Sequence, residues 1–360
     1  MENVKLSNIE LGLLTLGFLY GSSAISNPAM EAKRDAWFAL ILSWIIGSGF
    51  ILMTLYISKL NNGKCFTEIL YSCFGEVLGK FVTILYILFF LYKAAINTGL
   101  FGMFMAAVSY PETPFTVIMG VFLIAVIYVV RCGLGTLGKI SEILVPLIPL
   151  QVLIVAISIV TMKNYSGFQP MFLEIAPIIR SIADVISNIS GDFIVFLMIL
   201  PYTNDEKGRL KAAFCGFAGV GFILIIIVIR NLKVIGPELI ENFIYPAHVA
   251  AQLIPYISID PLIDLNLLLG EGFKVSVFLY AASKAIGEFF NLDNHKSLVC
   301  AIATLVIVIA DWLIPNGVEL KRWISSWAIF IWTAPFQLVF PLAMLIISAI
   351  KSRKGTLENP

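Results

Sequence analysis

The sequence predicts an all-α polytopic membrane protein with ten transmembrane helices, arranged as two inverted repeats of five. Three observations lead to this fold class. Of the 360 residues, 59% are hydrophobic and only 13% are charged, with a mean hydropathy of +0.94, unlike a soluble domain. Apolar stretches of about 20 residues, the length that crosses a bilayer, recur along the whole chain. Two of these stretches are interrupted at corresponding places in the two halves.

The apolar stretches define the expected spans and their grouping. The chain forms a single transmembrane domain over residues 1–360, with the first repeat at 9–162 and the second at 176–350. Lysine and arginine are more frequent in the loops on the side of the N-terminus, so both termini are expected to be cytoplasmic. The ten spans are placed at residues 9–30, 36–58, 80–108, 114–131, 140–162, 176–203, 210–230, 260–290, 296–314 and 327–350.

Two loops between the spans have a helical pattern of their own. Apolar residues recur every three or four positions from Phe66 to Leu78, which predicts an amphipathic helix on the membrane surface between spans two and three. A weaker stripe between Pro246 and Pro255 predicts a short helix that caps the opposite side.

The interruptions lie in spans one and six, at Gly21–Pro28 and Asn188–Asp192. Unwound backbone survives in a membrane only where it is buried in protein or lines a cavity. Broken helices in corresponding positions of two halves point to a binding site at the midplane. Span one runs outward and span six inward, as inverted repeats require. The alternative is a pair of ordinary helices with glycine kinks.

A broken helix presents free carbonyls at one end and free amides at the other, so the expected ligand is a zwitterion. The amides near Ser22–Ala24 would bind its carboxylate, and carbonyls of spans one and six would face its ammonium. Asp192 would serve either as the counter-ion of an amine or as a proton acceptor. Alternatively, the serines bond their own helix and Asp192 is a helix N-cap. The predicted ligand-binding residues are Gly21, Ser22, Ser23, Ala24, Ile25, Asn97, Ser190, Gly191, Asp192 and Phe196.

Lys93 is the most unusual charge in the chain. It lies about 12 residues into span three, roughly 18 Å along the helix, and an ionised lysine at this depth costs at least about 2.5 kcal/mol. It is expected either to replace a coupling cation or to form a buried ion pair with Asp192 or Glu271. Glu271 and Lys274, three residues apart in span eight, are expected to pair with each other.

Several classes of function are excluded. The sequence contains no GxxxxGK[ST], HExxH or GxSxG motif, so we expect no enzyme. The five cysteines are scattered without a CxxC spacing, so no metal or cofactor is expected. A net charge of +1 indicates no nucleic-acid partner.

Three stretches resemble the spore-germination permeases, within the amino acid–polyamine–organocation superfamily. They are Lys33–Trp37, Ile194–Tyr202 and Phe273–Ser283. The resemblance implies a LeuT-like fold and a germinant-sensing subunit that binds a small nutrient such as an amino acid. It also implies a location in the spore inner membrane, or another bacterial cell membrane, and two partner subunits, a larger membrane protein and a lipoprotein. The alternative is a secondary amino-acid transporter, proton-coupled or uncoupled.

Overall fold

The structure is a computed structural model that describes residues 5–21, 23, 28–158, 172, 174–204, 206–253, 260–315 and 332–358. These residues form helices and no strand apart from one isolated bridge between Leu6 and Thr203. The α-helices are α1 (Asn8–Tyr20), α3 (Ala36–Leu60), α4 (Phe66–Val108), α5 (Phe115–Cys132), α6 (Leu134–Leu144), α7 (Leu147–Ser158), α8 (Ile175–Val185), α9 (Glu206–Val234), α10 (Pro246–Gln252), α11 (Asp260–Phe289), α12 (Val299–Leu313) and α15 (Phe340–Glu358). Short 3₁₀ segments at Met30–Asp35, Ile240–Asn242 and His295–Leu298 precede α3, α10 and α12.

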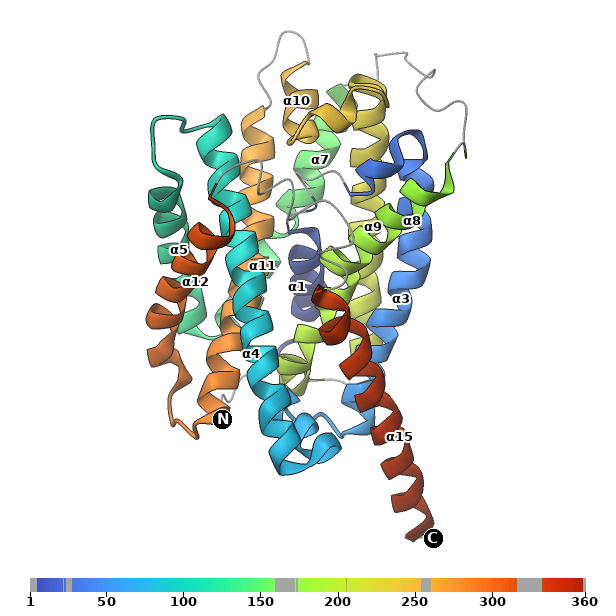
Figure 1. Cartoon of the computed structure of the whole chain (residues 1–360), viewed down its shortest axis with the longest axis vertical. Helices are drawn as coiled ribbons and strands as arrows, with labels where there is room; N and C mark the ends of the chain where they lie inside the picture. Colours follow the sequence, from blue (N-terminus) through green and yellow to red (C-terminus); the bar gives the residue numbers. More distant parts are fainter. Residues whose placement is uncertain are drawn as a thin grey trace.

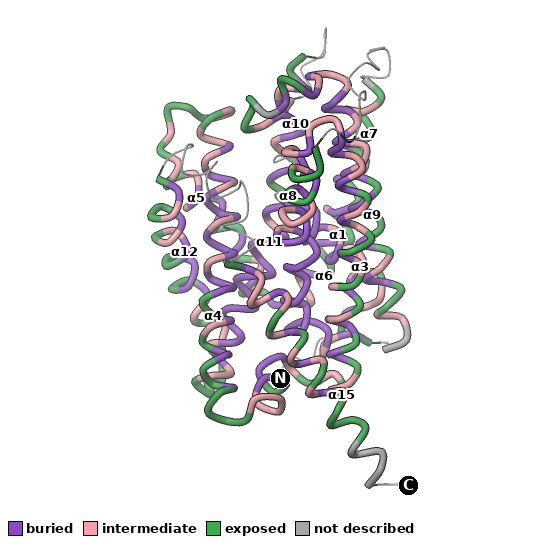
Figure 2. Tube along the Cα trace, turned by 45° about the vertical axis from the view of Figure 1, so that its right-hand side comes forward, coloured by how far each residue is buried: buried purple, intermediate pink, exposed green. Residues whose placement is uncertain are grey.

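Eight helical segments in the described part of the chain are long and apolar enough to cross a membrane. The predicted class, an all-α membrane protein, is therefore confirmed, whereas the count of ten spans stays a prediction. Two expected spans are not among the eight. α1 has only 13 residues, and α11 has 30 residues but also contains charged residues such as Glu271 and Lys274. Both are buried along most of their length (Figure 2).

The helices form a bundle with α10 at one end and both ends of the chain at the other (Figure 1). α5 and α12 lie on one flank, and α3 and α15 lie on the other. α1 packs mainly against α9, and α11 packs mainly against α4. α1 and α11 are thus enclosed by the surrounding helices.

The predicted surface helix forms the first turns of α4. Gly75 interrupts that helix with φ 79° and ψ −178°, a conformation that glycine adopts without steric cost. Before this kink Phe66, Ile69 and Leu70 are buried, as the stripe predicts. The last two residues of the stripe, Val77 and Leu78, lie beyond the kink and are exposed on the protein.

The short helix between the prolines is α10, as predicted. Its side chains Ala247 and Ala251 pack with Val155 and Ile263 in a small apolar cluster, which Val234 and Leu262 border. We call these six residues the α10 cluster.

The two interruptions differ in form. α1 ends at Tyr20 with Gly21 as its C-cap, and of residues 22–27 only Ser23 is described. In the second case the prediction of an unwound segment is wrong. α8 continues into a π-helical segment, Ile186–Ser190, and a 3₁₀ segment, Gly191–Met198, and Gly191 has helical angles of φ −66° and ψ −31°. The chain changes its type of helix instead of leaving the helical conformation.

This change of helix type frees backbone carbonyls. The N–H of Gly191 donates to Ile186, five residues back, whereas the following 3₁₀ segment bonds three residues back. The carbonyls of Ser187 and Asn188 are passed over by this shift. A buried carbonyl needs a hydrogen-bond donor, so side chains must supply one here.

Candidate functional site

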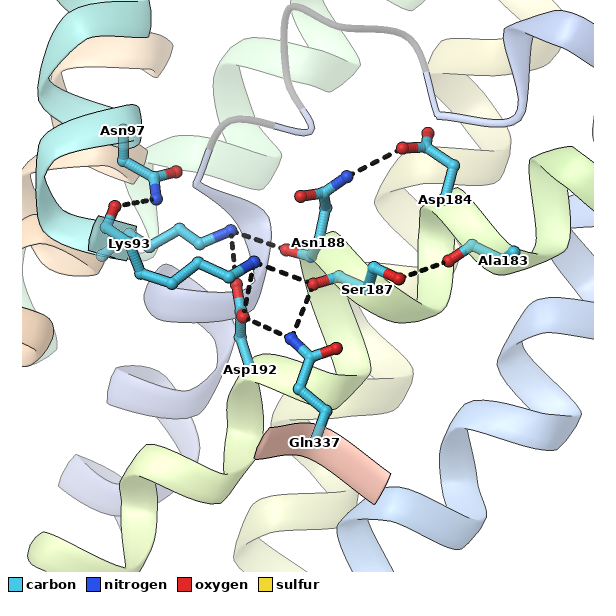
Figure 3. A network of polar contacts seen from close by, with 9 residues as sticks. Lys93, Asn97, Ala183, Asp184, Ser187, Asn188, Asp192 and Gln337 are labelled. Atoms are coloured by element: carbon cyan, nitrogen blue, oxygen red, sulfur yellow. Dashed lines mark hydrogen bonds and ion pairs between the residues drawn. The ribbon is translucent and has the colours of Figure 1, made fainter. Parts of the chain in front are cut away.

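Lys93 of α4 supplies the first donor. Its Nζ lies 2.9 Å from the carbonyl oxygen of Ser187 and 2.8 Å from Oδ1 of Asp192 (Figure 3). The side chain of Lys93 is 3% exposed and that of Asp192 is fully buried. The expected ion pair between Lys93 and Asp192 is therefore present. The carboxylate offsets the desolvation of the ammonium, which alone would be costly at this depth.

Lys274 of α11 supplies the second donor. Its Nζ lies 2.6 Å from the carbonyl oxygen of Asn188 and 3.3 Å from Oδ2 of Asp192. The predicted pairing of Lys274 with Glu271 is wrong, since neither carboxylate oxygen of Glu271 has a hydrogen-bond partner among the described residues. A spacing of three residues allows a local pair, but Lys274 instead reaches the carboxylate and carbonyl of another helix.

Gln337 completes the site, and sequence analysis did not identify it. It lies in a second π-helical segment, Pro335–Val339, directly before α15. Its Nε2 donates to Oδ1 of Asp192 and to the carbonyl of Ser187, both at 2.8 Å (Figure 3). A polar residue within the last expected span was the available signal, but one glutamine among apolar residues does not indicate which helix it faces.

Lys93, Asp192, Lys274 and Gln337 form what we call the Asp192 cluster. Two ammonium groups pair with a single carboxylate and one amide donates to it, and the same three groups donate to the two freed carbonyls. Such charge-assisted hydrogen bonds are stronger than neutral ones. The cluster connects α4, the π and 3₁₀ segments after α8, α11 and the segment before α15.

Two predicted glycines adjoin this cluster. A Cβ on Gly21 would lie 2.5 Å from Cδ of Lys274, and a Cβ on Gly191 would lie 2.6 Å from Cδ of Gln337. Both positions therefore need the absence of a side chain, and Gly21 brings the end of α1 into contact with the lysine.

Other predicted site residues do not join the cluster. Asn97 donates to the carbonyl of Lys93 at 2.6 Å, within its own helix. Ser190 faces Gly47 of α3, whose Cβ would lie 2.8 Å from its hydroxyl oxygen. Phe196 stacks on Phe193 with ring centroids 4.4 Å apart, so it packs in the core. Ser23 is buried; Ser22, Ala24 and Ile25 lie outside the described residues.

A second group of polar side chains surrounds Lys284. Lys284 of α11 is 5% exposed, and its Nζ lies 2.5 Å from the hydroxyl of Tyr202 and 3.9 Å from Glu288. Burial raises the pKa of the nearby Cys65 thiol at the start of α4, so this cysteine stays a neutral thiol at pH 7.

The fold is that of the LeuT-type membrane transporters. A nucleobase-cation-symport-1 transporter, Mhp1, superimposes with a TM-score of 0.67 at 13% identity, over 95% of this chain and 78% of its own. MhsT, solved in complex with L-phenylalanine, gives 0.62 at 13% identity over 96% and 99%. A Na⁺-coupled sialic acid symporter gives 0.66 at 13% identity over 96% and 89%.

Within this fold class the chain belongs to the spore germination protein family of permeases, whose family model matches residues 5–315. Spore germination protein KB of Bacillus subtilis (strain 168) is 27% identical over 98% of this chain and 97% of its own length. Spore germination protein A2 of the same organism is 22% identical over 98% of both chains. The resemblance seen in the sequence is thus confirmed.

Proposed function

We propose that this chain is the germinant-sensing membrane subunit of a spore germination receptor and that it binds a free amino acid beside the end of α1. The observation on which the proposal depends is the family match over residues 5–315. MhsT, which shares the fold, was solved with L-phenylalanine, and this supports an amino acid as ligand. The same similarity supports ten spans in two inverted repeats of five, with both termini cytoplasmic, in the spore inner membrane.

The contacts of the Asp192 cluster favour a sensor over a cation-coupled transporter. The carboxylate of Asp192 and the carbonyls of Ser187 and Asn188 are oxygen ligands of the kind that a coupling cation would use. Here the ammonium groups of Lys93 and Lys274 occupy them. Because the protein supplies both cations, this site needs no external ion. A shift at the end of α1, where Gly21 contacts Lys274, would alter the hydrogen bonds of the cluster.

The contacts also change the predicted role of Asp192. Its carboxylate already accepts from Gln337 and pairs with two ammonium groups, so it is not available to the ammonium of a ligand. In this proposal Asp192 holds the helices that surround the ligand, and other oxygens bind the ligand ammonium.

Spores that lack this chain test the proposal. We expect them to lose the response to one nutrient and to regain it on complementation. Affinity-tagged chain should co-purify with a larger membrane subunit and a lipoprotein. Spores that lack the chain but germinate normally with every nutrient, in a strain without a second copy of the gene, would refute the proposal.

A secondary amino-acid transporter is the second candidate, favoured by the transporter fold of the three solved structures. Purified chain in proteoliposomes tests it directly. Counterflow of a radiolabelled amino acid by the chain alone would support the transporter, and binding without counterflow would support the sensor.

A further inference from the structure

Arg230 of α9 has a buried guanidinium that lies outside the Asp192 cluster. The residue is 4% exposed, and its Nε donates to Oδ1 of Asn231 at 2.9 Å. Nη1 and Nη2 are buried and have no hydrogen-bond partner among the described residues. No Asp or Glu occurs in the three segments that continue the chain beyond α1, beyond α7 and before α11. These segments are residues 22–27, 159–171 and 254–259. A buried charge without a counter-charge is expensive, so this site requires an anion.

Two further unsatisfied groups lie at the same level of the bundle as Arg230. The α10 cluster provides the reference, because it contains Val155 of α7, Val234 of α9 and Ile263 of α11. One helical turn is 3.6 residues. Gln151 precedes Val155 by one turn, and Arg230 precedes Val234 by one turn.

Asn266 occupies the equivalent position on the third helix, one turn after Ile263. α7 and α9 run toward α10 and α11 runs away from it, so Gln151, Arg230 and Asn266 all lie one turn deeper than the α10 cluster. α7 packs against both α9 and α11. We call these three residues the Arg230 layer.

The end of α1 forms the next level below this layer. Tyr20 is fully buried and lies near Arg230. On α11, a Cβ on Gly270 would lie 3.1 Å from Cδ1 of Tyr20 and 3.0 Å from the carbonyl oxygen of Gly21. Gly270 follows Asn266 by four residues, or about one turn. The Arg230 layer therefore lies between the α10 cluster and the C-terminal end of α1.

The unsatisfied atoms of the layer are complementary to an amino-acid head group. Within the part of the chain that the structure describes, no hydrogen bond reaches Oε1 of Gln151 or either side-chain polar atom of Asn266, and all three atoms are buried. A buried polar atom without a partner is unfavourable. A guanidinium offers two N–H groups to one carboxylate. Amide oxygens only accept hydrogen bonds and therefore suit an ammonium group.

We propose that the Arg230 layer binds the head group of a free α-amino acid. Nη1 and Nη2 of Arg230 hold the carboxylate, and Oε1 of Gln151 and Oδ1 of Asn266 accept from the ammonium. This inference rests on the proposed function only for the choice of ligand class. It places the charged groups of the ligand one turn above Tyr20 and Gly21, and Gly21 in turn contacts Lys274 of the Asp192 cluster.

Binding to the purified full-length chain in nanodiscs tests the proposal. The probes are the twenty free amino acids and, for each that binds, its carboxamide and its N-acetyl derivative, measured by titration calorimetry. We expect the free acid to bind and both blocked forms to bind at least about tenfold more weakly, because each lacks one of the two charges. This comparison uses the wild-type chain and so does not depend on the folding of any variant.

Variants assign the carboxylate to Arg230. Arg230→Met should weaken binding by about ten- to a hundredfold, the range expected for hydrogen bonds to a charged group, without lowering the melting temperature of the unliganded protein. Arg230→Lys keeps the charge and should lose less affinity. The matched control is Arg131→Met, because Arg131 is an exposed arginine in the last turn of α5, and it should bind like wild type.

The outcomes separate this inference from the proposed function. Unchanged affinity in Arg230→Met, or equal affinity for the acid and its carboxamide, overturns the Arg230 site and leaves the sensor role in place. No binding of any amino acid to a chain that restores germination overturns the amino-acid ligand as well. Normal germination of spores without the chain refutes the sensor role whatever the binding data are.

Discussion

Replacement of Asp192 should destabilise this protein more than replacement of either lysine that it pairs with. Lys93 and Lys274 share the one carboxylate, at 2.8 Å and 3.3 Å. Asp192→Asn leaves two buried ammonium groups without a counter-charge, and removing one partner of a buried ion pair costs about 3–5 kcal/mol. Lys93→Met leaves the carboxylate with Lys274 and Gln337 and should cost about 1–3 kcal/mol.

The double variant provides the sharper measurement. With both Lys93→Met and Asp192→Asn, only Lys274 lacks a counter-charge, and it keeps the carbonyl of Asn188 at 2.6 Å. The double variant should therefore be more stable than the sum of the single effects predicts, by about 0.5–3 kcal/mol, as for other residues in one network.

Thermal unfolding in detergent, followed by size-exclusion chromatography, is the assay for this cycle. Lys80→Met is the matched control, because Lys80 also pairs with a carboxylate at 2.7 Å but is exposed, and an exposed pair contributes little. The reasoning is refuted if Asp192→Asn unfolds at the same temperature as Lys80→Met, or if the single effects simply add.

Three further predictions concern neighbours of the cluster. Gly21→Ala places a methyl group against Cδ of Lys274 and should reduce the germination response, whereas Gly272→Ala, with open space around the new Cβ, should not; equal responses would contradict the contact. Gln337→Leu removes one donor each from Asp192 and the carbonyl of Ser187 and should lower stability by about 1–3 kcal/mol, and an unchanged melting temperature would show that this donor is dispensable. Glu271→Gln replaces, by a neutral amide, a buried carboxyl group whose oxygens have no hydrogen bond to any described residue, so the melting temperature should not fall; a large decrease would show that the carboxylate itself is needed.

Sequence reasoning identified the positions of the interruptions but not their form. Small and polar residues at Asn188–Asp192 correctly indicated a departure from the regular α-helix. Whether the backbone leaves the helical region or changes to π and 3₁₀ hydrogen bonding depends on the donors available to the freed carbonyls. Those donors come from Lys93, Lys274 and Gln337, which lie far away in the sequence.

The same distinction explains the ion pairs. Lys93 was predicted to have an acidic partner because its depth in span three makes an unpaired charge costly, and depth follows from counting residues. The choice between Asp192 and Glu271 depends on how the helices are rotated about their axes. For Lys274 the sequence favours Glu271, three residues away, and this prediction is wrong because the ammonium pairs with the carboxylate of Asp192 at 3.3 Å.

By itself, the sequence determined that this is a helical membrane protein, where most of its spans lie, and that Gly21, Lys93 and Asp192 are unusual within them. These properties depend on hydropathy and on residue counts along one segment, which are local quantities. Only the tertiary structure decided that one carboxylate serves two lysines, that Gln337 joins them, and that Arg230, Gln151 and Asn266 lie at one level beneath α10. Those contacts join helices separated by long stretches of chain, and their geometry is set by how the helices pack together.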